Sequence, residues 1–152
     1  MDFRKIISTI LLILWMVIIF IFSNQNAITS EKVSDKVTSK TLTTVSEVTG
    51  KNLSDTRRKE LVENSRFMVR KMAHFTLYFI LGIIVYTTLV SYNIPKNKII
   101  YTIILCFIFS LLDEFHQLFT MGRTSRMFDV FIDTSGSIVS SMLIFMLRHK
   151  KV

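Results

Sequence analysis

The stretch from Ser110 to Gly136 reads SLLDEFHQLFTMGRTSRMFDVFIDTSG, and the rest of the chain is arranged around it. Its first apolar run is interrupted by two acids, a histidine and a glutamine, which are Asp113, Glu114, His116 and Gln117. A short turn follows, and a second apolar run then begins with Asp129 and Asp133 already inside it. Ionisable side chains are costly inside hydrophobic helices, so their presence at the mouth of two such helices predicts a functional site.

The composition is that of a small polytopic membrane protein. The chain has 152 residues, of which 50% are hydrophobic, with 13 Phe and one Pro. Ile, Leu, Phe and Val gather in long blocks, which is not the pattern of a soluble domain of this length. The net charge of +8 comes from cations that flank these blocks, so it favours a membrane over nucleic acid as the partner. The single cysteine, Cys106, is predicted to be a buried apolar side chain.

Four apolar segments are long enough to cross a bilayer as helices, and we expect them at residues 6–22, 72–91, 99–119 and 127–147. The first has the basic start of a signal peptide, but no small-residue cleavage site follows it, so we predict an uncleaved span. The predicted fold class is therefore an all-α membrane protein. We expect a four-span transmembrane helical bundle that forms a single domain over residues 1–152.

The polar segment 23–71, between the first two spans, is expected to form one or two short helices on the outer membrane surface. Valines recur near helical spacing in its first half, and Gly50 is placed to end that helix. Ser54 or Asp55 is placed to cap a second helix. The Thr and Ser run at 38–46 predicts that the first helix is marginal in isolation.

Four spans put both termini on one side of the membrane, and the positive-inside rule selects that side. The N-terminus, the 93–98 loop and the C-terminus are short and basic, whereas the 120–126 turn holds only Arg123 and Arg126. The segment 23–71 carries more cations than acids, but long translocated segments count less in this rule. We expect a multi-pass protein of a bacterial-type cytoplasmic (plasma) membrane with both termini in the cytoplasm.

In this topology, polar residues from three spans reach the same outer face. Counted inward from the helix ends at about 1.5 Å per residue, one layer lies near the mouth and a second lies roughly 10 Å in. The first layer contains His74, His116, Gln117 and Asp129, and the second contains Tyr78, Asp113 and Asp133. These matched depths predict one shared site.

Helical spacing also places these residues on common faces. Asp113, His116 and Gln117 follow i, i+3, i+4 and share one face, whereas Glu114 points about 100° away from Asp113. The second apolar run carries a stripe of Asp129, Asp133, Gly136 and Ser140 at helical spacing. The small residues Gly82, Gly136 and Ser140 predict close helix approach below the polar mouth.

Three motifs occur in order within residues 66–147. They read Arg70-Lys71-x-x-His74-Phe75-x-x-Tyr78-x-x-Leu81-Gly82, Asp113-Glu114-x-His116-Gln117-x-Phe119-x-x-x-Arg123 and Asp129-x-x-x-Asp133-x-x-Gly136. Together they resemble the VanZ-like family, whose name comes from a protein linked to low-level resistance to the glycopeptide antibiotic teicoplanin. The chain departs at Asp133, where the family usually has Asn, and at Ser140, where a second Gly is common. The resemblance implies a cell-envelope protein, without implying a particular reaction.

We predict that the outer-face site recognises a lipid-linked envelope precursor or a glycopeptide in contact with membrane lipid. Arg side chains suit such ligands because they bind phosphate or carboxylate with two parallel hydrogen bonds. The predicted binding residues are Arg70, Lys71, His74, Tyr78, Asp113, Glu114, His116, Gln117, Arg123, Asp129 and Asp133.

Two other interpretations stay open, and with them the question of catalysis. The first is a hydrolase or transferase acting on an outer-leaflet lipid-linked substrate. Here His74 or His116 is the general base, Asp113 or Asp129 orients it, and Arg123 stabilises developing negative charge. The second is a structural role, in which Arg70, Lys71 and Arg123 neutralise the acids. No GxSxG or HExxH motif is present, and we expect no metal and no cofactor.

Overall fold

The computed structural model describes residues 2–24, 27–50, 54–94, 96–119 and 127–149. Over these ranges the chain is helical, and its helices are α1 (Phe3–Ser23), α2 (Ala27–Thr49), α3 (Asp55–Ser91), α4 (Lys98–Gln117) and α5 (Met127–His149). α1, α3, α4 and α5 are long and apolar enough to cross a membrane. This result confirms the predicted all-α membrane protein with four candidate spans.

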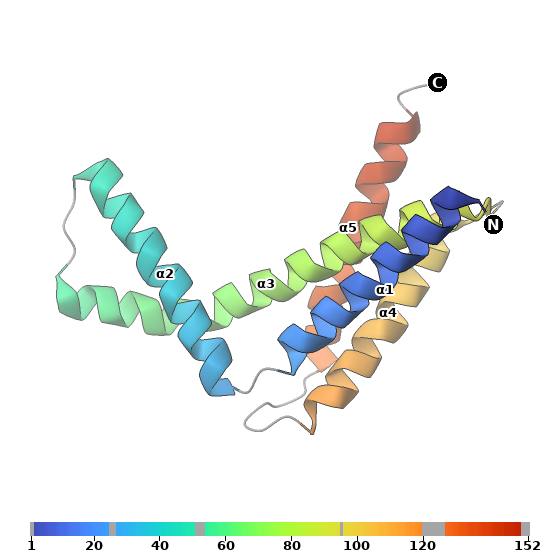
Figure 1. Cartoon of the computed structure of the whole chain (residues 1–152). Helices are drawn as coiled ribbons and strands as arrows, with labels where there is room; N and C mark the ends of the chain where they lie inside the picture. The colour runs from blue at the N-terminus through green and yellow to red at the C-terminus, as the bar shows by residue number, and fades with distance from the viewer. Residues whose placement is uncertain (1, 25–26, 51–53, 95, 120–126, 150–152) are drawn as a thin grey trace.

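α1, α3, α4 and α5 pack into a bundle, while α2 lies outside it against the first part of α3 (Figure 1). α1 and α3 run antiparallel, and polar groups join them at two levels. Ser8 Oγ lies 2.7 Å from Ser91 Oγ, and Trp15 Nε1 donates to the carbonyl oxygen of Leu77 at 3.0 Å. The bundle core between them is small and contains Ile19, Tyr78, Leu81, Val85 and Cys106, the last fully buried as predicted.

Small residues set the approach of α3 to α5. A Cβ on Gly136 would clash with the backbone carbonyl oxygen of Phe75, and a Cβ on Gly82 would clash with the side chain of Ser140. The two backbones therefore touch only because these positions carry no side chain, as the sequence predicted. This contact fixes how α3 and α5 are rotated toward each other, and so where their polar side chains point.

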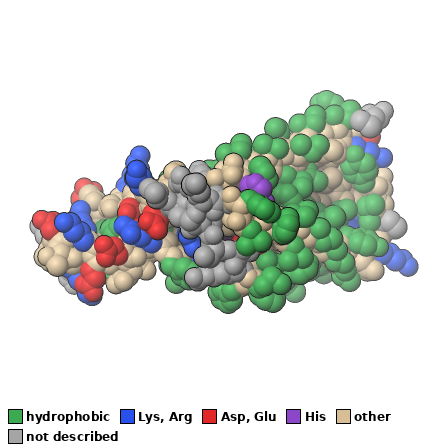
Figure 2. Space-filling view, turned by 90° about the horizontal axis from the view of Figure 1, so that it is seen from below, with side chains coloured by type: hydrophobic (Ala, Val, Ile, Leu, Met, Phe, Trp, Pro, Cys, Tyr) green, Lys and Arg blue, Asp and Glu red, His purple; other side chains and the backbone are tan. Residues whose placement is uncertain are grey.

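The outer surface of the bundle is apolar. Large side chains are exposed on several helices, including Leu14 at 55%, Ile104 at 47% and Phe131 at 68% of their surface. Figure 2 shows hydrophobic side chains covering this face of the bundle, with Lys, Arg, Asp and Glu gathered over the part that projects from it. A continuous apolar belt of this kind is unfavourable in water, and a lipid bilayer accounts for it. The protein is an integral membrane protein.

The segment between the first two spans differs from the prediction of short helices. α2 is 23 residues long and ends before Gly50, whose φ is +67°. The Thr and Ser run lies within this helix, and hydroxyls such as those of Thr41 and Ser46 donate to carbonyl oxygens one turn earlier. The helix capped by Ser54 does not stop before the membrane. It continues as α3 for 37 residues.

The continuity of α3 has a simple cause, since residues 56–81 contain no Gly or Pro to break the helix. α2 and the first part of α3, residues 55–70, form a unit that we call the arm. The arm is closed by Arg66, whose Nε and Nη2 atoms donate to the two carboxylate oxygens of Asp35 at 2.6 and 2.8 Å. A two-point pair of this type fixes the register of α2 on α3.

Candidate functional site

The polar residues that the sequence placed on three spans gather at one end of the bundle, where α1 and α4 end and α5 begins (Figure 1). The outermost pair is Lys71 on α3 with Asp129 on α5, which form an ion pair. Lys71 is only 7% exposed, so both charges are largely removed from solvent. A pair of this kind ties α3 to α5 and agrees with the structural interpretation for these two residues.

Next to this pair, His74, Asp113 and Asp133 converge from α3, α4 and α5, and we call them the triad. One ligand-capable atom from each lies within 4.8 Å of those of the other two. The Nδ1 atom of His74 is 3.6 Å from Oδ1 of Asp133. Asp113 is 3% exposed and Asp133 is fully buried. The structure thus brings together three residues that are far apart in the sequence, although the sequence placed His74 in the outer layer and the two acids in the deeper one.

Each acid of the triad is held through one of its two oxygens. Oδ2 of Asp113 accepts hydrogen bonds from Ser23 Oγ at 2.5 Å and from Gln117 Nε2 at 3.1 Å. Oδ2 of Asp133 accepts one from Ser110 Oγ at 2.9 Å. Within the described ranges, Oδ1 of each acid has no hydrogen-bond partner. The carboxylates are therefore oriented by neutral groups, and each presents one remaining oxygen.

Sequence reasoning missed the two serines. Ser23 begins the polar segment that follows the first expected span, yet it is buried and bridges Asp113 and Gln117. Ser110 was treated as part of an apolar run. A signal for it existed, because Ser110, Asp113 and Gln117 follow i, i+3, i+7 and occupy one helix face.

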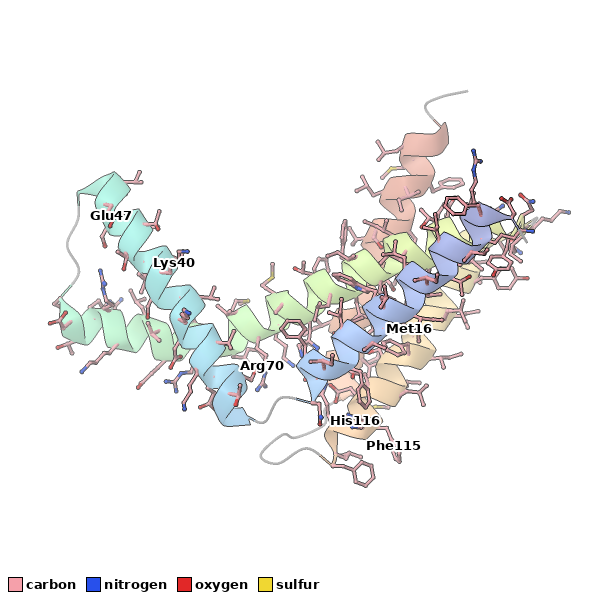
Figure 3. The ribbon with its side chains drawn as sticks, in the orientation of Figure 1. Met16, Lys40, Glu47, Arg70, Phe115 and His116 are labelled. Carbon is pink, nitrogen blue, oxygen red and sulfur yellow. The ribbon has the colours of Figure 1, made fainter. Side chains whose placement is uncertain are left out.

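His116 is not brought into the triad, although its spacing to Asp113 predicted a shared face. Its ring centroid lies 4.3 Å from that of Phe20 on α1, and Figure 3 shows it at the end of α4. Glu114 is 4% exposed, so it faces the protein rather than the surrounding membrane or water. Tyr78 is fully buried in the bundle core. The predictions that rest on Arg123 lie outside the described residues.

Among the described residues, the two acids of the triad lack the cationic partners that a purely structural role predicts. Lys71 is committed to Asp129, and Arg70 points elsewhere. In the part of the chain that the structure describes, neither Asp113 nor Asp133 forms an ion pair with a Lys or Arg. The catalytic interpretation named Asp113 or Asp129 as the carboxylate that orients the base. The structure places Asp133 beside His74 Nδ1, at 3.6 Å, whereas Asp129 pairs with Lys71.

A groove of about 560 Å³ runs between α2, α3 and the end of α1. Most of the side chains along it are apolar, and they include Phe22, Val33, Val37, Met68, Val69, Met72, Ala73 and Leu77. Arg70 and His74 are its two ionisable residues. Figure 3 shows Arg70 beside the crossing of α2 and α3. His74 therefore connects this groove to the buried acids.

Comparison with known proteins bears on the whole chain. No curated protein and no solved structure matches it. The family model described as VanZ/LLP1 matches residues 8–148, which extends the resemblance seen in the three motifs to the first span and the arm. With nearly its entire length matched, the chain belongs to the VanZ/LLP1 family.

Proposed function

We propose that this membrane protein binds a lipid-linked envelope precursor or a glycopeptide at its outer face, through an anionic group of that ligand, and so contributes to teicoplanin resistance. In this proposal the chain resides in a bacterial-type cytoplasmic membrane with both termini in the cytoplasm. The groove and the triad then open on the outer side. The observation that carries the proposal is the groove between α2 and α3.

The groove has the properties of a site for an amphipathic ligand. Its volume of about 560 Å³ falls within the usual range of small-molecule sites. Its walls are apolar, and it lies beside the apolar belt of the bundle, so an acyl or prenyl chain can enter it from the bilayer without crossing water. Arg70 and His74 then meet the polar end of the same molecule.

Arg70 supports an anionic head group. It forms no ion pair within the described residues, in contrast to Arg66, which is held by Asp35. It also lines a neighbouring pocket of about 240 Å³ together with Ser30, Glu31, Ser34, Glu63, Arg66 and Phe67. A guanidinium that forms no ion pair with a described residue, beside an apolar groove, suits phosphate or carboxylate, which it binds through two parallel hydrogen bonds.

The test uses one variant that fills the groove and one that removes the cation. Ala73→Trp places a large ring in the groove at an exposed position, so the bundle core is unaffected. Arg70→Ala removes a charge-assisted hydrogen bond, which should cost about 1.5–3 kcal/mol, or more than about tenfold in affinity. Both variants should lower the teicoplanin concentration that cells survive. Variants must be compared at equal membrane expression.

Two control variants make the same kinds of substitution at positions outside the groove. Ile104→Trp adds the same ring at a lipid-facing position of α4, and Arg57→Ala removes an exposed arginine paired with Glu60. Both should keep full resistance. If Ala73→Trp and Arg70→Ala also keep it, the groove is not the ligand site and the proposal is wrong.

A membrane hydrolase or transferase is the second candidate, and the position of His74 favours it. His74 lines the groove and its Nδ1 atom lies 3.6 Å from Asp133 Oδ1, so a shift of about 0.5 Å would let the carboxylate orient the ring as a general base. Purified protein in nanodiscs of phosphatidylglycerol should then convert that lipid, with products detected by mass spectrometry. His74→Gln should abolish conversion. If the lipid stays intact after prolonged incubation with the unaltered protein, the protein does not catalyse a reaction of this lipid.

A further inference from the structure

The triad presents three metal-ligand atoms toward one point. The imidazole of His74 and the carboxylates of Asp113 and Asp133 come from three different helices, and one ligand-capable atom from each lies within 4.8 Å of the other two. Two of these residues are 3% exposed or less. A group of acids alone can form by chance on a protein surface, but this group is internal and contains a histidine.

The hydrogen bonds around the triad leave open the atoms that a cation needs. Ser23 and Gln117 occupy Oδ2 of Asp113, and Ser110 occupies Oδ2 of Asp133. Oδ1 of both acids and Nδ1 of His74 have no hydrogen-bond partner among the described residues, although all three are buried. Metal-binding carboxylates are commonly held in this way, with one oxygen fixed by a neighbouring donor and the other directed at the ion.

The buried negative charge of the triad is an independent reason to expect a bound cation. Removing an ionised carboxylate from water without a partner is strongly unfavourable, and here two are removed together. Lys71 is already paired with Asp129, and no other Lys or Arg of the described chain pairs with Asp113 or Asp133. A protonated His74 would offset only one negative charge. One divalent cation would offset both and would satisfy all three unpartnered atoms.

We propose that His74, Asp113 and Asp133 bind a divalent metal ion. One imidazole and two carboxylates form a donor set suited to Zn²⁺ or Mn²⁺. Bond lengths of about 2.0–2.2 Å place ligand atoms of one ion about 3–4 Å apart, so the triad needs to close by about 1 Å. Three protein ligands leave a coordination position for water or for an oxygen of a bound molecule. The site does not depend on the lipid ligand proposed above.

The metal itself is the readout of the test. Full-length protein in detergent is stripped with EDTA and then titrated with Zn²⁺ by calorimetry and with Mn²⁺ by electron paramagnetic resonance. We expect one ion per chain. His74→Ala, Asp113→Asn and Asp133→Asn should each weaken binding by more than about tenfold, since outer partners of metal ligands alone are worth that much.

Matched controls change the same residue types outside the triad. His116→Ala removes the histidine that packs on Phe20, and Asp35→Asn removes a carboxylate of the arm. Both should bind as the unaltered chain does, and circular dichroism should show equal helix content in all variants. If a triad variant does not fold, X-ray absorption of the Zn²⁺-loaded unaltered protein replaces it as the test. The spectrum distinguishes an ion bound by imidazole nitrogen and carboxylate oxygen from an ion surrounded by water alone.

Two results would overturn the proposal. One is an unaltered chain that binds neither Zn²⁺ nor Mn²⁺ at a defined stoichiometry, which would make the triad a proton-sharing network. The other is equal binding by triad variants and controls, which would place the ion elsewhere. Neither result bears on the groove, whose variants Ala73→Trp and Arg70→Ala leave every triad residue in place.

Discussion

Ser23, the last residue of α1, donates its hydroxyl proton to Oδ2 of Asp113 on α4 across 2.5 Å. It also accepts a hydrogen bond from Gln117, and it is 1% exposed, so water cannot replace it. Ser23→Ala should therefore lower the free energy of unfolding by about 1–3 kcal/mol, as expected when buried polar groups lose a partner. Denaturation in mixed micelles, followed by circular dichroism, measures this change.

The control for Ser23 is Ser141, which is also fully buried. Its hydroxyl donates only to the backbone carbonyl of Ser137 on the same helix. Ser141→Ala leaves no side chain on another helix without a partner, so it should change the free energy of unfolding by less than about 1 kcal/mol. Equal losses of unfolding free energy in the two variants would show that the hydrogen bonds from Ser23 to α4 do not stabilise the protein.

Breaking the Lys71–Asp129 pair should be far more costly than breaking an exposed pair. Lys71→Met leaves Asp129 without its cation in a mostly buried position, which should lower the free energy of unfolding by about 3–5 kcal/mol. Arg57→Ala breaks an exposed pair with Glu60 and should cost less than about 1 kcal/mol. A double variant with the two charges exchanged should recover part of the loss. The same denaturation assay applies, and no recovery would contradict a purely electrostatic pairing.

Gly136→Ala should separate α3 from α5. The new methyl group would meet the backbone of Phe75, which cannot rotate away as a side chain can. Overpacking of this kind typically costs about 1–3 kcal/mol, and it should also displace His74 from Asp133. Gly50→Ala, the same substitution just after α2, has no atom within 4 Å of the added Cβ. Its positive φ of +67° would strain the backbone there, far from the contact of α3 with α5, so the bundle should stay intact. Disulfide trapping between cysteines placed on α3 and α5 reports the separation.

Labelling in intact cells tests the proposed orientation. Ser54, between α2 and α3, and Lys96, between α3 and α4, are both exposed and lie beyond opposite ends of α3. An impermeant maleimide should label Ser54→Cys and should not label Lys96→Cys until the cells are lysed. Cys106 is fully buried and should not react. Labelling of Lys96→Cys in intact cells would place the groove and the triad on the cytoplasmic side.

Hydropathy predicted the spans well because long apolar blocks with charged ends rarely form anything other than membrane-spanning helices. The expected span 6–22 is observed within α1, and the expected 127–147 within α5. The continuity of α3 was missed for a physical reason. The chain changes from polar to apolar residues at Met72, and this change marks where the helix passes from water into the membrane. It does not mark a helix end, because a helix ends only where its backbone is interrupted.

The site was predicted in part by counting depth along each helix. That method found His74, Asp113 and Asp133, because ionisable groups stand out in apolar segments. It could not separate His74 from His116, since the rotation of α4 is set mainly by its packing against α5 and α3, and this rotation leaves His116 against Phe20 of α1. It also passed over Ser23 and Ser110, because most helix serines bond to their own backbone and only tertiary structure shows which do not.

The 37-residue α3 gives the molecule a mechanical property. It is one continuous helix, about 55 Å along its axis, that carries Arg66 of the arm and, two turns later, His74 of the triad. Because no hinge residue separates the two, a force applied to the arm is transmitted along the helix axis instead of being absorbed by a loop. The arm and the buried acids of the triad are therefore joined by one uninterrupted helix.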